Sequence, residues 1–142
     1  MTPSGVDAQI VGEWIRRAED DALNARSILK HRDGTPAHVC FLSQQIVEKM
    51  LKAALVYFTG DDAEKTHALR RLSRLLAGHV PALAAEDTML DRLSEYYVGA
   101  RYPSDLPLES FTWERAIEAF AAAEAITAVV RSALKLGEDE RG

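Results

Sequence analysis

Apolar residues recur along this chain at helical spacing, and no segment shows the sustained period-two alternation of a half-buried strand. Glycine and proline stand between these segments, at the candidate junctions. The pattern predicts five helices, at about residues 6–30, 36–59, 64–77, 82–100 and 112–136. Helices joined by short connections favour an all-α fold, here an up-and-down four-helix bundle with one additional short helix.

Local signals mark several of the expected helix ends. Gly34 closes the first segment, and Pro36 is suited to the first turn of the second, which Gly60 would stop. Thr112 is the expected N-cap of the last segment. A chain of 142 residues fits one domain, so we expect a single domain over 1–142 with a core of about 6–136. The acidic tail at 137–142 is expected to fray.

The second segment has an apolar arc wider than half the helix, beside a narrow arc of Gln, Glu and Lys. A solvated face would carry fewer large apolar groups, so this face favours a partner surface, most simply a two-fold homodimer. The expected interface residues are Phe41, Gln45, Glu48 and Leu55. The alternative is that Glu48 and Lys52 form an ordinary helix-spaced pair worth about 0.3 kcal/mol.

Asp21 falls in the middle of the apolar face of the first segment. A buried carboxylate costs several kcal/mol, on the order given for buried charge, unless it is paired or hydrogen-bonded. Either Asp21 lies at the edge of a helix face and is partly solvated, or a cation forms an ion pair with it. Arg101 is one candidate, since it lies on the same side of the fourth segment as Tyr97 and suits a helix end. Its planar fork of donors can clamp an acid such as Asp21 or Glu86, or bind a phosphate.

The charge balance limits how the protein can meet nucleic acid. Seventeen basic and 22 acidic residues give a net charge of −5, whereas a protein held to a duplex through phosphates alone is usually basic. Contact with nucleic acid would therefore be local, be brought by a partner, or use two copies of a basic patch.

Other features point to an ordinary cytoplasmic protein. The start of the chain lacks the pattern of a signal peptide, and no apolar stretch approaches the ~20 residues that span a bilayer, so we expect no membrane association. The single cysteine, Cys40, is expected to be a small buried hydrophobe instead of a reactive thiol.

No metal or other cofactor is expected from the sequence. None of the four histidines has the i, i+4 spacing of a zinc helix, and there is no cysteine pair to help. The chain also lacks the GxxxxGK[ST] and GxGxxG phosphate loops and the GxSxG elbow. His67, near the start of the third segment, is expected to cap or pack between helices.

Four motifs occur in order along the chain: Ala18-Glu-Asp-Asp-Ala-Leu23, the Gln-Gln-x-x-Glu-Lys-x-x-Lys-Ala helix from Gln44 to Ala53, His67-Ala-Leu69, and Tyr97-x-x-x-Arg-Tyr-Pro103. Over about residues 14–130 this order resembles the HEPN family. The resemblance implies a helical bundle that is commonly dimeric and is often encoded beside a minimal nucleotidyltransferase, as a toxin–antitoxin or substrate-binding pair.

The resemblance also implies a chemistry, because many family members are metal-independent ribonucleases that use an arginine and, a few residues further on, a histidine. Arg101 matches the arginine. The histidine is expected at 106 to 108, where this chain has Leu106, Pro107 and Leu108, and no histidine follows Arg101 anywhere. Loss of a general acid or base typically removes a factor of ~10²–10⁴ from a rate.

We therefore expect a non-catalytic HEPN-type binding module that associates with a nucleotide, RNA or a minimal nucleotidyltransferase. Arg101 would contact phosphate, Tyr97 or Tyr102 would stack on a base, and Asp21 would belong to the same site. Gln45 and Lys52 are further candidates, from helix-face geometry alone.

Two alternatives stay open. One is a ribonuclease toxin in which Tyr102, Asp105 or His67 takes over the role of the missing histidine. The other is a purely structural dimeric adaptor.

Overall fold

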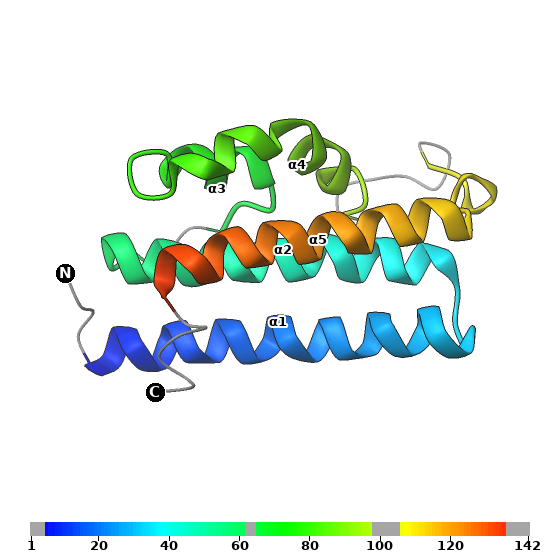
Figure 1. Ribbon diagram of the computed structural model, residues 1–142, viewed down its shortest axis with the longest axis horizontal. Helices are drawn as coiled ribbons and strands as arrows, with labels where there is room; N and C mark the ends of the chain where they lie inside the picture. The colour runs from blue at the N-terminus through cyan, green and yellow to red at the C-terminus, as the bar shows by residue number, and fades with distance from the viewer. Residues whose placement is uncertain (1–4, 62–64, 98–105, 136–142) are drawn as a thin grey trace.

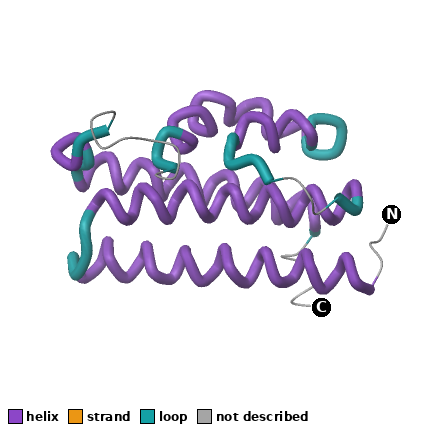
Figure 2. The backbone as a smooth tube through the Cα atoms, turned by 180° about the vertical axis from the view of Figure 1, so that it is seen from behind, coloured by secondary structure: helices purple, strands orange, loops and turns teal. Residues whose placement is uncertain are grey.

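The computed structural model describes residues 5–61, 65–97 and 106–135, and the structural statements below concern these residues. They form helices and connections without any strand, which confirms the all-α prediction (Figure 2). The elements are α1 (Gly5–His31), α2 (Pro36–Thr59), α3 (Leu69–Leu75), the 3-10 helix η1 (Pro81–Glu86), α4 (Asp87–Ser94), the 3-10 helix η4 (Leu108–Ser110) and α5 (Trp113–Leu134).

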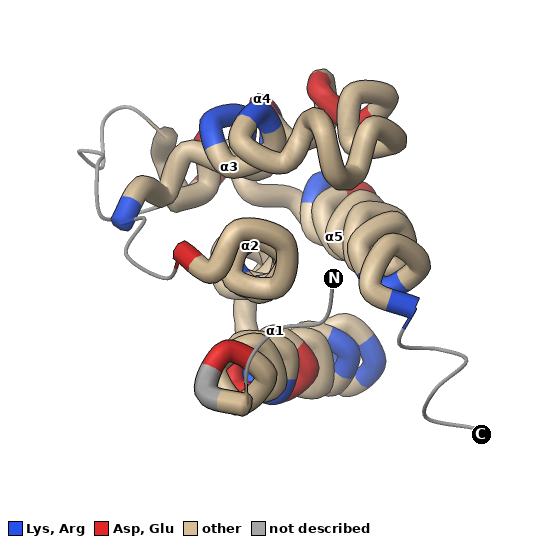
Figure 3. Tube along the Cα trace, turned by 90° about the vertical axis from the view of Figure 1, so that its left-hand side faces the viewer, with Lys and Arg blue, Asp and Glu red and all other residues tan. Residues whose placement is uncertain are grey.

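The long helix α2 lies at the centre of the bundle. In Figures 1 and 3, α1 lies along one side of α2 and α5 along another, while the shorter α3 and α4 cover the side away from α1. The composition of α2 explains its place, since Val47, Met50, Leu51, Ala53 and Ala54 are all fully buried. Burial of each large apolar side chain contributes roughly 1.5–3 kcal/mol, so a helix apolar on most sides is most stable with neighbours all round.

The ends of α2 follow the local signals in the sequence. The Thr35 hydroxyl accepts a hydrogen bond from the His38 backbone N–H at 3.3 Å, and Pro36 occupies the first turn. At the other end Gly60 is left-handed, with φ of 74°, and its N–H donates to the Val56 carbonyl at 2.8 Å. The predicted helix over 36–59 is therefore confirmed at both ends.

The first and last helices also match their predictions closely. Helix α1 spans Gly5–His31, against an expected 6–30. Helix α5 starts after Thr112, whose hydroxyl accepts from the Arg115 N–H at 3.1 Å as an N-cap should. It ends at Leu134, where Lys135 takes a left-handed conformation with φ of 59°.

The third helix is shorter than the prediction of 64–77. Helix α3 covers only Leu69–Leu75, and residues 65–68 before it are not helical. The hydrogen bonds of this stretch go elsewhere: the Leu69 N–H donates to the Ser94 hydroxyl at 3.2 Å, and the His67 carbonyl accepts from the Gln44 side chain at 3.5 Å. These contacts with other elements hold the chain extended where the periodicity alone predicts helix.

The prediction of one continuous fourth helix over 82–100 is wrong. The segment starts as the 3-10 helix η1 and becomes α-helical only at Asp87, and α4 ends at Ser94. The N–H groups of Glu95 and Tyr96 then bond to carbonyls three residues earlier, which tightens the chain into a turn. Tyr96 is only 2% exposed, so burial of its ring accompanies this early end. The expected end near residue 100 lies outside the described residues.

Cys40 is fully buried on α2, in agreement with its expected role as a small hydrophobe. Burial raises the pKa of this thiol to about 11. Burial likewise raises the pKa of the Tyr96 hydroxyl to about 12. Across the described ranges no helix combines the length and apolar character needed to cross a membrane.

The left-handed end of α2 gives a stability test. Replacing Gly60 by Ala places a side chain at φ of 74° and should lower the free energy of unfolding by about 1 kcal/mol. Gly12→Ala is the matched control: it lies within α1, its added Cβ meets nothing within 4 Å, and it should stabilise by about 0.5–1 kcal/mol. Urea unfolding measures both, and equal shifts of one sign would contradict the assignment of the α2 end.

Candidate functional site

Asp21 forms an ion pair with a lysine of the neighbouring helix. Lys49 Nζ of α2 lies 2.5 Å from Asp21 Oδ2 of α1, and their side chains are 20% and 14% exposed. The pair links the two longest helices and neutralises the carboxylate on the apolar face of α1. In the described part of the chain, Asp21 therefore serves the packing of α1 on α2.

A second polar cluster is built on α2 from three side chains at i, i+4 and i+8, which share one face of the helix. We call Gln44, Glu48 and Lys52 the α2 polar row. All three are buried, with exposed fractions of 0%, 5% and 8%. Gln44 Nε2 donates to Glu48 Oε1 at 2.9 Å, and Lys52 Nζ donates to Glu48 Oε2 at 3.0 Å.

The Glu48 carboxylate is the centre of this cluster. His67 Nδ1 lies 3.1 Å from both of its oxygens, so Glu48 meets one amide, one ammonium and one imidazole donor. Lys52 balances its charge and also lies 5.6 Å from the centre of the Trp14 ring of α1. Burying a carboxylate is tolerable only with such complete pairing.

His67 joins this buried cluster to the surface, because its side chain remains 44% exposed. A carboxylate can only accept, so Glu48 favours the imidazole tautomer that carries its proton on Nδ1. In that tautomer Nε2 carries a lone pair, and no hydrogen bond to Nε2 is formed within the described residues. The ring is thus oriented through Nδ1, and part of the side chain remains exposed.

Tyr97 stacks on the same histidine. The ring centroids of His67 and Tyr97 lie 4.1 Å apart with an angle of 14° between the planes, and Tyr97 is half-buried. Because Glu48 holds His67 from the side, the two rings form a supported aromatic surface, which we call the His67–Tyr97 stack. Tyr97 directly precedes residues 98–105, which lie outside the described chain.

The structure brings some of the predicted site residues together and separates others. Tyr97 stacks on His67, and His67 contacts the Glu48 carboxylate that also pairs with Lys52. Gln45 is half-buried, and its side-chain Nε2 donates to the Gln44 side-chain oxygen at 2.7 Å. Asp21 instead belongs to the ion pair with Lys49. The expected contributions of Arg101, Tyr102 and Asp105 fall on residues outside the described chain.

The face of α2 expected to meet a partner is largely covered by the chain's own helices. Glu48 and Leu55 are 5% and 3% exposed, and Phe41 and Gln45 are half-buried. The sequence reasoning assigned this face to a partner, whereas the polar groups of Gln44, Glu48 and Lys52 are satisfied by His67 and by one another. That any of this face meets a partner stays a prediction.

His67 is the functional candidate to which the sequence reasoning gave too little weight. A signal for it was present: Gln44, Glu48 and Lys52 recur on one face of a helix that is otherwise strongly apolar. A buried polar row of this kind requires an outside partner, and a histidine at the start of a nearby segment is a suitable one. Within the described ranges, no three His, Cys, Asp or Glu side chains gather in a way that could hold a metal ion.

Comparison with known proteins identifies the family. The family description for the HEPN domain matches residues 11–133. The chain belongs to the HEPN domain family. The crystal structure of ST0689, described as an archaeal HEPN homologue, is 31% identical in sequence, with a TM-score of 0.66. The match covers 86% of this HEPN chain and 95% of that one. The search of curated proteins returned no match.

The Glu48 cluster predicts a large, specific loss of stability in this HEPN protein. Glu48→Ala leaves Lys52 without its buried counter-charge and should lower the free energy of unfolding by about 3 kcal/mol or more. Asp91→Ala removes an exposed pair, Arg70–Asp91 at 2.8 Å, and should cost less than about 1 kcal/mol. Chemical denaturation compares the two variants, and losses of equal size would show that the Glu48 cluster is not a stabilising centre.

Proposed function

We propose that this HEPN protein binds a nucleotide unit, as RNA or free nucleotide, without cleaving it. The observation that carries the proposal is the His67–Tyr97 stack, with ring centroids 4.1 Å apart. Single-stranded RNA is recognised largely by stacking of unpaired bases on aromatic rings, at about 1–3 kcal/mol per base. The exposed part of the His67 ring allows a base to extend the stack.

The cluster beneath the stack supports this role. Glu48 fixes the His67 ring through Nδ1, so little side-chain freedom remains to be lost when a base binds. Arg101, four residues beyond Tyr97, enters the proposal from the sequence alone as the phosphate contact. The net charge of −5 is consistent with a few local contacts instead of a broad basic surface.

Binding can be tested by fluorescence anisotropy with labelled single-stranded RNA in EDTA at low salt. Tyr97→Ala should weaken binding by about tenfold or more, because one base loses its stacking surface, while Tyr97→Phe should bind nearly as the parent. Arg101→Ala should also weaken binding and should flatten its dependence on salt.

The chain offers a matched control in a second histidine–aromatic stack, Phe58 with His79, whose centroids lie 4.9 Å apart. His79→Ala should leave RNA affinity unchanged. Equal binding by the parent and Tyr97→Ala would contradict the proposed site. Failure of the parent to bind either RNA or nucleotide would reject the function, and would direct the search to a protein partner such as the minimal nucleotidyltransferase of the resemblance.

The geometry of His67 favours ribonuclease activity as the second candidate. With Nδ1 oriented by Glu48 at 3.1 Å, Nε2 can accept the proton of an RNA 2′-hydroxyl. The 2′-oxygen would then bond to phosphorus while the bond from phosphorus to the 5′-oxygen breaks. The products would be a 2′,3′-cyclic phosphate and a 5′-hydroxyl that takes its proton from solvent.

This second candidate makes a separable prediction. If it holds, the parent cuts RNA in EDTA to 2′,3′-cyclic phosphate ends, and His67→Ala loses a factor of ~10²–10⁴ in rate while remaining folded. An RNA with a single 2′-deoxy sugar at the cut position should stay intact there and serves as the substrate control. RNA that is bound but never cut by the parent would reject catalysis and leave the binding proposal standing.

A further inference from the structure

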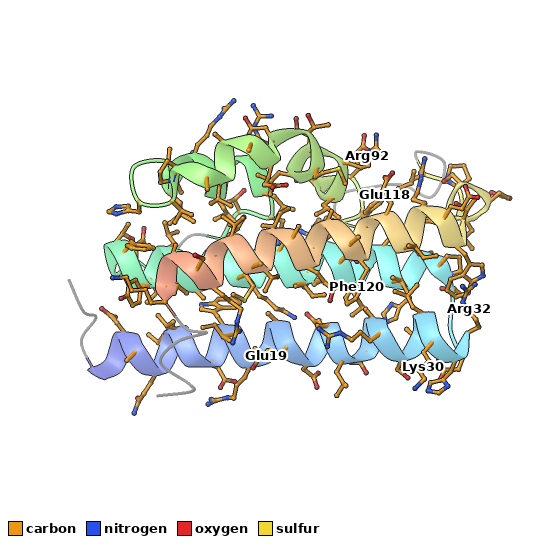
Figure 4. The ribbon with its side chains drawn as sticks, viewed as in Figure 1. Glu19, Lys30, Arg32, Arg92, Glu118 and Phe120 are labelled. Carbon is orange, nitrogen blue, oxygen red and sulfur yellow. The ribbon has the colours of Figure 1, made fainter. Side chains whose placement is uncertain are left out.

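A groove of about 350 Å³ runs between α1 and α5 and shares no lining residue with the Glu48 cluster or the His67–Tyr97 stack. It forms because both helices pack against α2 and leave space between themselves (Figure 3). Figure 4 labels Phe120 on the α5 side of this groove and Glu19 on the α1 side. Pockets that bind small molecules have volumes of about 300–1,000 Å³, so the groove is large enough for a small ligand.

The floor of the groove is apolar and long. Ile46 and Met50 of α2 and Phe120 of α5 contribute to it, and the small side chain of Ala22 on α1 leaves room above them. The lining on α5 runs from Phe120 to Arg131, which is about 16 Å at a rise of about 1.5 Å per residue. An extended alkyl chain matches a floor of this length and character better than a compact polar molecule does.

Two ion pairs cross the groove. Arg131 Nη1 lies 3.5 Å from Glu19 Oε2, and Arg26 Nη2 lies 3.6 Å from Glu124 Oε2. Both distances exceed the roughly 2.7–2.9 Å of a charge-assisted hydrogen bond, so an incoming anion can compete for either arginine. Arg131 is the least exposed of the four side chains, at 24%, whereas the two glutamates are 56% and 52% exposed. The most buried charge of the groove is therefore positive.

Thr127 lies one helical turn before Arg131 on the same face of α5, and it also lines the groove. Its hydroxyl oxygen is buried and forms no hydrogen bond within the part of the chain that the structure describes. Buried polar groups are generally hydrogen-bonded, because an unpaired one is destabilising. An unsatisfied hydroxyl beside the most buried cation of the groove indicates a missing acceptor that carries negative charge.

We propose that the groove binds an aliphatic monocarboxylate of medium chain length. The planar fork of Arg131 and the hydroxyl of Thr127 donate to the carboxylate, and the alkyl chain lies over Met50 and Ile46 toward Phe120. The Arg26 guanidinium lies 5.6 Å from the centre of the Phe120 ring, so its side chain covers the far end of the alkyl chain. This ligand site is separate from the proposed nucleotide site and does not depend on it.

Isothermal titration calorimetry with hexanoate, octanoate and decanoate tests the alkyl chain. Each added CH₂ should lower the Kd about fourfold, because burial of one CH₂ contributes about 0.8 kcal/mol. Decylamine has a chain of the same length as decanoate but a positive head group. It should bind at least tenfold more weakly than decanoate, because its head group meets Arg131 instead of a counter-charge.

Three variants test the residues of the groove with decanoate as the probe. Arg131→Gln should raise the decanoate Kd at least tenfold, because the charge that binds the carboxylate is lost. Thr127→Val should raise it roughly threefold to tenfold, yet should leave the free protein at least as stable to urea, because the unpaired hydroxyl is removed. Ala22→Leu places a larger side chain in the groove and should abolish binding.

Arg92→Gln is the matched control. Arg92 also pairs with a glutamate of a neighbouring helix, Glu118 of α5, but neither residue lines the groove. It should leave the decanoate Kd unchanged, and circular dichroism checks that every variant is folded. A parent that shows no saturable binding of decanoate up to millimolar concentration overturns the proposal. Equal affinity for decanoate and decylamine overturns it, as do Arg131→Gln and Ala22→Leu variants that weaken binding no more than Arg92→Gln does.

Discussion

The buried Glu48 carboxylate is the constraint on which the candidate site depends. Because this carboxylate is buried on the central helix, it needs hydrogen-bond donors. These are Gln44 and Lys52 of its own helix and His67 of the connection before α3. The His67 ring in turn stacks on the ring of Tyr97, which follows α4. One desolvated charge thereby links three elements that are distant in sequence, and it places an aromatic surface at the point where they meet.

The same central helix determines how the remainder of the bundle is arranged. Because α2 is apolar on most sides, α1 and α5 both gain more by packing on it than on each other. Their mutual contacts include two partly exposed ion pairs, whose residues line a groove. The interior is therefore organised by α2, and α1 and α5 leave a groove between them.

Helix class and the ends of the long helices could be predicted from the sequence, because they depend on local features such as the Thr35–Pro36 start and the Gly60 stop of α2. The third and fourth helices could not, since Leu69 bonds to Ser94 and Tyr96 turns into the core, and such long-range contacts leave no periodic signal. The site shows the same division. The polar row on α2 is visible in the sequence, but its partner His67 and the pairing of Asp21 with Lys49 depend on how the helices are placed in space.

Cys40 has a consequence for studying all of these features. It is the single thiol of the chain, it is fully buried on the central helix, and its pKa is raised to about 11. A thiol reagent at neutral pH can therefore react appreciably only with molecules that have opened around α2. The rate at which Cys40 reacts with such a reagent therefore reports how often the core around α2 opens, without any label or added residue.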